Sequence, residues 1–269
     1  MFLGTHTGVG KHTLCCAILR YLKNKGISVS PFKAVSIDNY TCRLDSKHEI
    51  SFAQTLQALA AGKKPVVEMN PYVAVYNSTF ALMELGKRLT ERPDMIQNKK
   101  HYLTVIEKSF KKLASESEIV VIEGGGSPVE LGLEEIDLAN IPLVEIANPK
   151  ILLVTEMIHG GGYASILGTL SLLPENIRTK VIGIILNKFD INEPKQFIQK
   201  GIKRLHELVN LPVMVIPFLN NTFIPDENIY YTIDYENLCS YDNEIDQLAR
   251  IIVTNLDIDM ITTALEINN

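Results

Sequence analysis

A glycine-rich turn near the start of the chain constrains its fold more than any other feature. Residues 4–13, with the sequence GTHTGVGKHT, follow a short apolar run, Met1–Leu3, and precede an apolar helical pattern that reaches Asn24. A turn of this kind points backbone N–H groups inward, the helix N-terminus adds positive potential, and the lysine reaches terminal phosphates. The sequence therefore predicts a phosphate-binding loop. Its nucleotide-contacting residues are predicted to be Thr5, His6, Thr7, Gly8, Val9, Gly10, Lys11, His12 and Thr13.

The loop departs from the common pattern in two ways. Five residues separate Gly4 from Gly10, one more than usual. The residue after Lys11 normally offers a hydroxyl to Mg²⁺, but here it is His12, and imidazole is a poor ligand for that ion. Either Thr13 compensates, carboxylates hold the metal, or nucleotide turnover is weakened.

The rest of the chain alternates apolar strand patterns with amphipathic helices. Such a pattern is typical of an α/β fold with a mostly parallel sheet and helices on both faces. Residues 33–47 are expected to form a loop, Asn70 and Pro71 mark a turn, and the segment from there to Asn98 is the least regular. The predicted strands are Met1–Leu3, Ile27–Phe32, Ile119–Ile122, Lys150–Val154, Val181–Leu186 and Val213–Ile216, and the predicted helices span 13–24, 51–61, 102–115, 163–173, 197–208 and 243–256.

Composition narrows the class of protein. The 269 residues, 46% of them hydrophobic, are enough to bury a full core. A formal charge of −5 argues against nucleic acid or an anionic membrane as the main partner. No apolar run is long enough to span a membrane, and the glycine-rich loop comes too early for a signal peptide. The four cysteines are not spaced as the ligands of a metal site. We expect a cytoplasmic protein with reduced thiols.

Several polar residues stand at strand ends. Glu123, before three glycines, ends an apolar run and could hold Mg²⁺ at the carboxyl edge of the sheet. Glu49 precedes a helix, where the helix dipole alone would favour it. Asn187 and Lys188 partly resemble the base-reading NKxD element of GTPases, although any strand can end in Asn-Lys. Asp137 is one acid among three, and nothing internal singles it out.

Taken together, these segments resemble the N-terminal ATP-binding domain of cobyric acid synthase, which is itself similar to dethiobiotin synthetase. The resemblance extends over about residues 2–228. It rests on Gly4–Leu14, Pro31–Lys33, His48–Ile50, 53–54, 57–58, 61–62, Met69–Pro71, Ile122–Pro128, Asp137–Asn140, 160–161, Ala164–Leu170, Asn187–Phe189 and Pro225–Glu227.

The resemblance implies a P-loop fold of the dethiobiotin synthetase type and an ATP-dependent reaction. ATP would phosphorylate a corrinoid carboxylate, and ammonia would attack the acyl phosphate to give an amide. Lys11, Lys33 and Asp137 would serve catalysis, Asn187 and Lys188 would bind the nucleotide, and Glu49 and Glu123 would hold Mg²⁺. Candidate partners are the carboxylate substrate, a separate glutaminase subunit and a second copy of the chain.

Departures from that pattern leave alternatives open. A lysine of the family is lost in residues 69–76, and an arginine is lost in 156–161, where His159 stands. The expected organisation is a synthetase-like domain, 1–228, and an extension, 229–269, with a terminal helix and no glutaminase domain. The first hypothesis is an amide-forming ligase. The second is a degenerate homologue that binds nucleotide or a partner without catalysis, and the third is a dethiobiotin synthetase-type ligase.

Overall fold

A parallel sheet forms the centre of the fold in the computed structural model, which describes residues 1–38, 40–77, 79–89, 94–190, 192, 194–219, 233–234 and 238–266. Strands β1 (Phe2–Gly4), β10 (Ile151–Glu156), β11 (Val181–Phe189) and β12 (Val213–Pro217) pair in that order. Strand β2 (Val29–Phe32) pairs with β9 (Ile119–Ile122), and a parallel bridge between Phe2 and Glu123 brings β9 beside β1. The six predicted strands are therefore confirmed, with ends shifted by a few residues.

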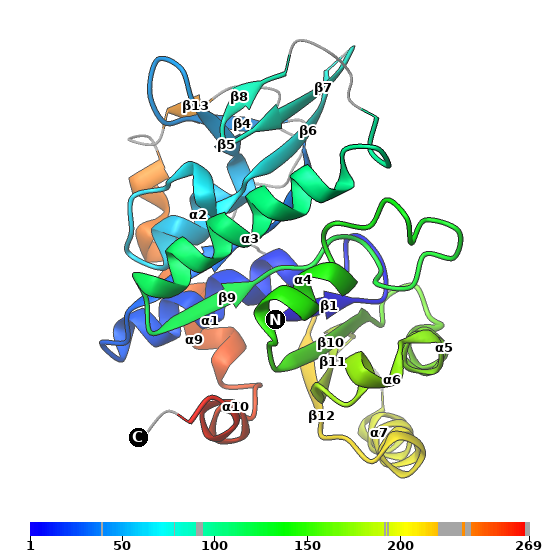
Figure 1. Cartoon of the computed structure of the whole chain (residues 1–269). Helices are drawn as coiled ribbons and strands as arrows, with labels where there is room; N and C mark the ends of the chain where they lie inside the picture. The colour runs from blue at the N-terminus through cyan, green and yellow to red at the C-terminus, as the bar shows by residue number, and fades with distance from the viewer. Residues whose placement is uncertain are drawn as a thin grey trace.

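Alternate residues of the central strands enter different cores. Phe2 packs with α1 (Lys11–Asn24), α2 (Phe52–Ala60) and α9 (Asp242–Val253), whereas Leu3 packs with α5 (Gly162–Leu172), α6 (Glu175–Arg178) and α7 (Lys195–Val209). Leu152 and Leu153 of β10 divide in the same way. Because successive strand residues point to opposite faces, helices cover both sides of this sheet, as predicted. Figure 1 shows α9 on one side of the strands and α5 and α7 on the other.

A third core lies under β2 and β9. Phe32 and Ile122 from these strands pack against α3 (Lys99–Ser115) and α4 (Ile141–Ala147), with Met69 from the 3₁₀ turn η1 (Val67–Met69). Helix α3 was predicted, although it begins three residues earlier than expected, at Lys99 instead of Tyr102. Helix α4 was not predicted, because seven residues are too few to show a clear helical period.

Two smaller sheets correct the expectation for residues 33–47 and add strands to the segment between Asn70 and Asn98, whereas the predicted helix over 51–61 is confirmed as α2. One contains β3 (Val35–Asp38), β6 (Tyr72–Asn77), β7 (Thr79–Glu84) and β8 (Lys87–Arg88); the other contains β13 (Ile233–Asp234), β4 (Thr41–Arg43) and β5 (Glu49–Ser51). The predicted loop over 33–47 is therefore wrong, since it holds β3 and β4. Strands of three or four residues carry too little alternation to be recognised before their distant partners are known.

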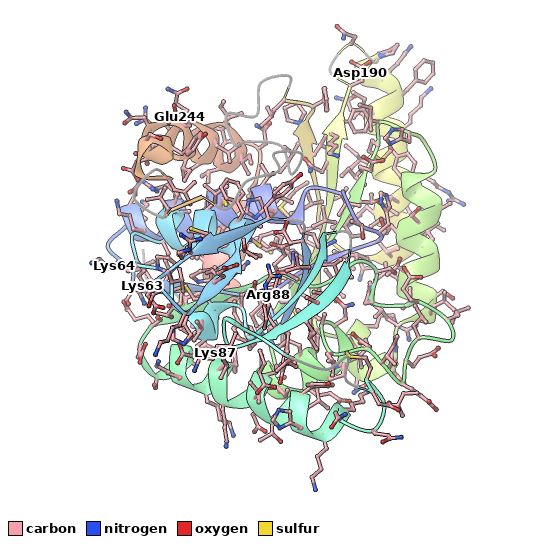
Figure 2. The ribbon with its side chains drawn as sticks, turned by 90° about the horizontal axis from the view of Figure 1, so that it is seen from above. Lys63, Lys64, Lys87, Arg88, Asp190 and Glu244 are labelled. Carbon is pink, nitrogen blue, oxygen red and sulfur yellow. The ribbon has the colours of Figure 1, made fainter. Side chains whose placement is uncertain are left out.

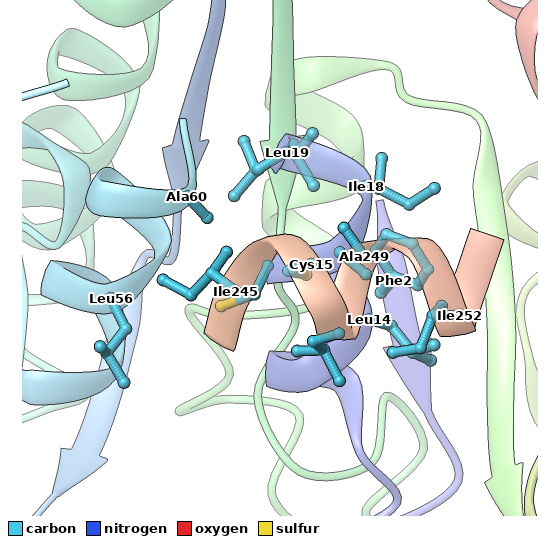
Figure 3. Close-up of a cluster of buried hydrophobic side chains, with 14 of the residues drawn as sticks. Phe2, Leu14, Cys15, Ile18, Leu19, Leu56, Ala60, Ile245, Ala249 and Ile252 are labelled. Atoms are coloured by element: carbon cyan, nitrogen blue, oxygen red, sulfur yellow. The ribbon is translucent and has the colours of Figure 1, made fainter. Parts of the chain in front are cut away.

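The C-terminal helix α9 belongs to the same core as the glycine-rich loop's helix. Its Ile245, Ala249 and Ile252 pack against Leu14 and Ile18 of α1, as Figure 3 shows. The buried Arg20 guanidinium of α1 donates to Asp242 Oδ1 at 2.5 Å and lies 3.4 Å from Asp246 Oδ1. The predicted boundary at residue 228, and residues 225–227 of the resemblance, lie outside the described residues.

The last elements of the described residues are the 3₁₀ turn η2 (Cys239–Tyr241), α9 and α10 (Ile258–Ala264). Helix α9 confirms the helix predicted over 243–256, but it is not the last helix as predicted, because α10 follows it. Within the described part of the chain, every helix is too short or too polar to cross a membrane.

Candidate nucleotide-binding site

The loop between β1 and α1 holds Lys11 in a fixed position. Its ammonium Nζ donates to the carbonyl oxygens of His6 and Gly126, both at 3.1 Å, and the residue is only 6% exposed. Gly4 makes this possible, because a Cβ there would lie 2.6 Å from Lys11 Nζ. Since the lysine already lies along the loop, its charge is in place for an anion bound against the loop's backbone N–H groups.

Two side chains from the end of β11 support the loop from the other side. Asn187 Nδ2 donates to the carbonyl oxygen of Val9 at 2.8 Å, and Lys188 Nζ donates to that of Gly8 at 2.7 Å. Gly10 has a φ of 95°, and a Cβ on it would lie 2.2 Å from Asn187 Nδ2. The structure thus places both predicted nucleotide-binding residues beside the loop. Their present hydrogen bonds are to its backbone, and the adenine contact predicted for Asn187 stays a prediction.

A second layer fixes the glycine turn that follows β9. Asn140 is 6% exposed, and its Nδ2 donates to the carbonyl oxygens of Gly125 and Ser127 at 2.7 and 3.1 Å. Asp137 fixes Asn140 in turn, because its carboxylate accepts the backbone N–H groups of residues 139, 140 and 141 at the start of α4. Asp137 therefore supports the turn whose Gly126 holds Lys11. The catalytic role predicted for Asp137 stays a prediction.

Glu123 is the centre of a buried polar cluster at the end of β9. It is 3% exposed; Lys33 Nζ lies 2.7 Å from its Oε1, and Gln57 Nε2 donates to its Oε2 at 2.5 Å. His12 Nδ1 lies 3.7 Å from the same Oε2 and 3.0 Å from Gln57 Nε2. Burial alone would raise the pKa of Glu123, but Lys33 and His12 lower it well below its usual range. This carboxylate is therefore ionised and compensated by cationic and amide donors.

His12 connects the loop's helix to this cluster. Its Nε2 lies 3.7 Å from Cys16 Sγ, one helical turn further along α1. Burial lowers the pKa of His12, whereas Cys16 and Glu123 raise it, and the net pKa is about 10. Thr13, the other residue considered as a hydroxyl donor, is half-buried on α1.

The family resemblance implies Mg²⁺, but the side chains around Glu123 fit this ion poorly. Position 12 offers an imidazole where a hydroxyl is usual, and both oxygens of Glu123 already accept hydrogen bonds. Glu49 lies in β5, and its Oε2 accepts from Thr41 Oγ1 at 2.7 Å. Among the described residues, no three His, Cys, Asp or Glu side chains come together as a metal site. Mg²⁺ binding by Glu49 and Glu123 stays a prediction.

The end of β10 contributes a further acid, Glu156, beside the loop. Lys188 Nζ, which holds Gly8, lies 3.3 Å from Glu156 Oε2, and His159 contacts Glu156 Oε1. Burial would raise the pKa of Glu156, but these two partners lower it. Asp190, the last residue of the partial NKxD element, accepts from Asn192 and lies at the periphery in Figure 2. The acid of that element is thus turned to solvent.

Sequence reasoning assigned no role to several residues that shape this site. Gln57 and Asn140 stand in the segments that carry the family resemblance, which was the available signal for them. Glu156 stands first in residues 156–161, the segment in which the family's arginine is lost, and this was the available signal for it. Each of the three has a partner that is distant in sequence, such as Gln57 and Glu123, 66 positions apart.

Comparison with known protein families finds one family whose sequence pattern includes the loop. Residues 1–229 match the family described as the CobQ/CobB/MinD/ParA nucleotide binding domain. The match covers the loop, β9 with Glu123, the Asp137–Asn140 segment and β11, so the whole site described above falls within it.

Curated relatives agree with this match. The chain is 34% identical over 222 residues to cobyric acid synthase of Clostridium botulinum, covering 81% of this chain and 44% of that protein. It is 36% identical over 230 residues to a probable cobyric acid synthase of Methanocella arvoryzae, covering 84% of this chain and 47% of that protein. The chain therefore spans about half the length of the curated relatives it matches. Among solved structures, the MinD cell division protein of Aquifex aeolicus aligns with 95% of this chain and 96% of that chain, at 14% identity and a TM-score of 0.45.

Proposed function

The chain belongs to the CobQ/CobB/MinD/ParA nucleotide-binding domain family, and on that premise we propose that it binds ATP on the loop of residues 4–13 for the amidation of a corrinoid carboxylate. The observation that carries the proposal is the buried Lys11 at the N-terminus of α1, whose ammonium donates to the carbonyl oxygens of His6 and Gly126. A lysine fixed in this way supplies a charge to the terminal phosphates of a nucleotide. The 34–36% identity to cobyric acid synthases supports the corrinoid substrate.

In the proposed reaction, a carboxylate oxygen of the corrinoid attacks the γ-phosphorus of ATP and ADP leaves. Ammonia then attacks the carbonyl carbon of the acyl phosphate, phosphate leaves, and an amide remains after loss of a proton. Reactions of this kind depend on positioning and on neutralising phosphate charge. Lys11 is placed for the second task, and its carbonyl partners and the Asp137–Asn140 support serve the first. We assign no step to Mg²⁺, because the arrangement around Glu123 fits that ion poorly.

A second candidate function is nucleotide binding without catalysis. The observation that favours it is His12, which stands where a hydroxyl usually serves the reacting phosphates. The two candidates differ in one measurement. Release of ADP that depends on added corrinoid acid and ammonium supports the ligase, whereas ATP binding with no such release supports the non-catalytic homologue.

Calorimetric titration with ATP tests the binding that both candidates share. We expect the Lys11→Ala variant to bind ATP about 10- to 100-fold more weakly than the natural chain, since charge-assisted hydrogen bonds contribute about 1.5–3 kcal/mol. Lys64→Ala is the matched control, because Lys64 is exposed and lies at the edge of the molecule in Figure 2. Equal affinities of the natural chain and Lys11→Ala would refute the proposed site.

A further inference from the structure

The side chain at position 12 lies between the first turn of α1 and the end of β9. His12 Nδ1 is 3.7 Å from Glu123 Oε2, so the imidazole and the carboxylate face each other beside Lys11. In phosphate loops with a hydroxyl at this position, the hydroxyl contributes to a Mg²⁺ site. Mg²⁺ requires an octahedron of oxygen ligands at about 2.0–2.1 Å. Any ion bound jointly by position 12 and Glu123 would have to lie between these two groups.

Gln57 of α2 already fills that place. Its Nε2 is 2.5 Å from Glu123 Oε2 and 3.0 Å from His12 Nδ1, so an amide nitrogen lies between the two groups. The orientation of this amide is fixed, because Gln57 Oε1 accepts from Gln54 Nε2 at 2.9 Å and Gln57 Nε2 must face the carboxylate. The bridging position therefore presents N–H groups, which repel a cation, whether or not the imidazole is protonated.

Charge at the cluster leads to the same conclusion. Glu123 is 3% exposed, and Lys33 Nζ lies 2.7 Å from its other oxygen, Oε1. Its negative charge is thus compensated by a cation from the chain itself. A divalent ion between residue 12 and Glu123 would have to displace Gln57 from Oε2 and accept an imidazole nitrogen as a ligand, which is unfavourable for a hard cation such as Mg²⁺.

From this arrangement we infer that the loop binds the phosphate groups of ATP without Mg²⁺, with the Gln57 amide occupying the position that a divalent ion would take between residue 12 and Glu123. The inference rests on the proposed ATP binding and deepens it. Lys11 and the loop's N–H groups then supply the attraction for the phosphates. The affinity for ATP is accordingly independent of divalent ions.

Calorimetric titration of the natural chain with ATP, in EDTA and in Mg²⁺, tests this directly. We expect dissociation constants that agree within about threefold, a difference below about 0.7 kcal/mol. Binding in Mg²⁺ that disappears in EDTA would overturn the inference and leave the proposed function standing. Absence of ATP binding in both buffers would overturn the proposed function together with the inference.

Two variants at position 12 identify the cause. His12→Thr removes the imidazole that lies against the Gln57 amide and supplies the missing hydroxyl. We expect this variant to bind ATP at least about 10-fold more tightly in Mg²⁺ than in EDTA. His12→Ala removes the imidazole without adding a hydroxyl and is expected to show no such preference. If His12→Thr and His12→Ala respond to Mg²⁺ equally, the side chain at position 12 does not control metal use. The comparison of the natural chain in the two buffers needs no variant, so it decides the question even if either substitution impairs folding.

Discussion

Replacing Asp137 distinguishes a supporting role from a catalytic one. In the structure, its two carboxylate oxygens accept backbone N–H groups from residues 139, 140 and 141, at 2.9–3.0 Å. A hydrogen bond to a charged group contributes about 1.5–3 kcal/mol, and losing a helix-capping side chain costs about 0.5–2 kcal/mol. One carboxylate makes all three bonds, so we expect Asp137→Ala to lower the free energy of unfolding by about 2–3 kcal/mol. For a chain of this size that corresponds to a fall in Tm of about 4–12 °C.

The same change should weaken ATP binding. Asp137 holds Asn140, Asn140 holds the turn of residues 125–127, and the carbonyl oxygen of Gly126 accepts from Lys11. Ordering that turn again on binding costs about 1 kcal/mol, which is about a fivefold increase in Kd. Thermal unfolding and calorimetry with ATP measure the two effects. Asp257→Ala is the control, because Asp257 caps α10 through Met260 N and should lower stability without changing ATP affinity.

A purely catalytic Asp137 would give a different pattern. The Asp137→Ala variant would then unfold at the same temperature as the natural chain and bind ATP equally well, while losing corrinoid-dependent release of ADP. That result would refute the supporting role and favour the contact with substrate that the family resemblance implies.

Two further variants test the loop and the C-terminal packing. Gly10→Ala should lower the free energy of unfolding by about 2 kcal/mol and weaken ATP binding, because Gly10 has a φ of 95° and the new Cβ would meet Asn187. Gly168→Ala is the control. A Cβ at this position in helix α5 meets nothing within 4 Å, so the substitution should be neutral or slightly stabilising. Equal effects of these two alanines would contradict the prediction. The hydrogen bond from Arg20 lowers the pKa of Asp242 in the folded chain. The Arg20–Asp242 pair therefore stabilises the fold fully above the pKa of an unfolded aspartate, about 3.9, and this stabilisation is lost as the pH falls through the lower pKa of the folded chain. In urea unfolding, the stability difference between the natural chain and Asp242→Asn should therefore shrink on acidification, and a difference that grows would refute the assignment.

The parts of the fold that the sequence predicts are those with strong local patterns. Apolar runs such as 119–122 and 181–186 became central strands, and the glycine-rich turn became the loop between β1 and α1. Within residues 33–98, the helix predicted over 51–61 is confirmed as α2, but the short strands could not be predicted in the same way. Strand β3 pairs with β6 across more than thirty residues, and β4 and β5 contain only three residues each. Pairings of this kind are determined by contacts distant in sequence, which periodicity does not reveal.

The site follows the same rule. Lys11, Glu123, Asn187 and Lys188 could be singled out because each stands at a strand or helix end. What they contact could not be predicted. The NKxD resemblance suggested a base contact for Asn187, which stays a prediction, but it did not indicate that the amide donates to the backbone of Val9. Nothing local indicates that Gln57, inside the apolar helix α2, bonds a glutamate 66 residues away.

The contacts around the loop separate ATP binding from metal use. Lys11, Asn187 and Lys188 donate to carbonyl oxygens of the loop or of the turn after β9. All three donors lie at the carboxyl edge of one parallel sheet. His12 takes no part in these bonds, since its ring contacts Gln57, Glu123 and Cys16. A substitution at position 12 therefore changes the ligand offered to a metal ion, while the hydrogen bonds that shape the loop remain. For this reason we expect Lys11→Ala to weaken ATP binding about 10- to 100-fold in either buffer. We expect His12→Thr to alter only the dependence of that binding on Mg²⁺.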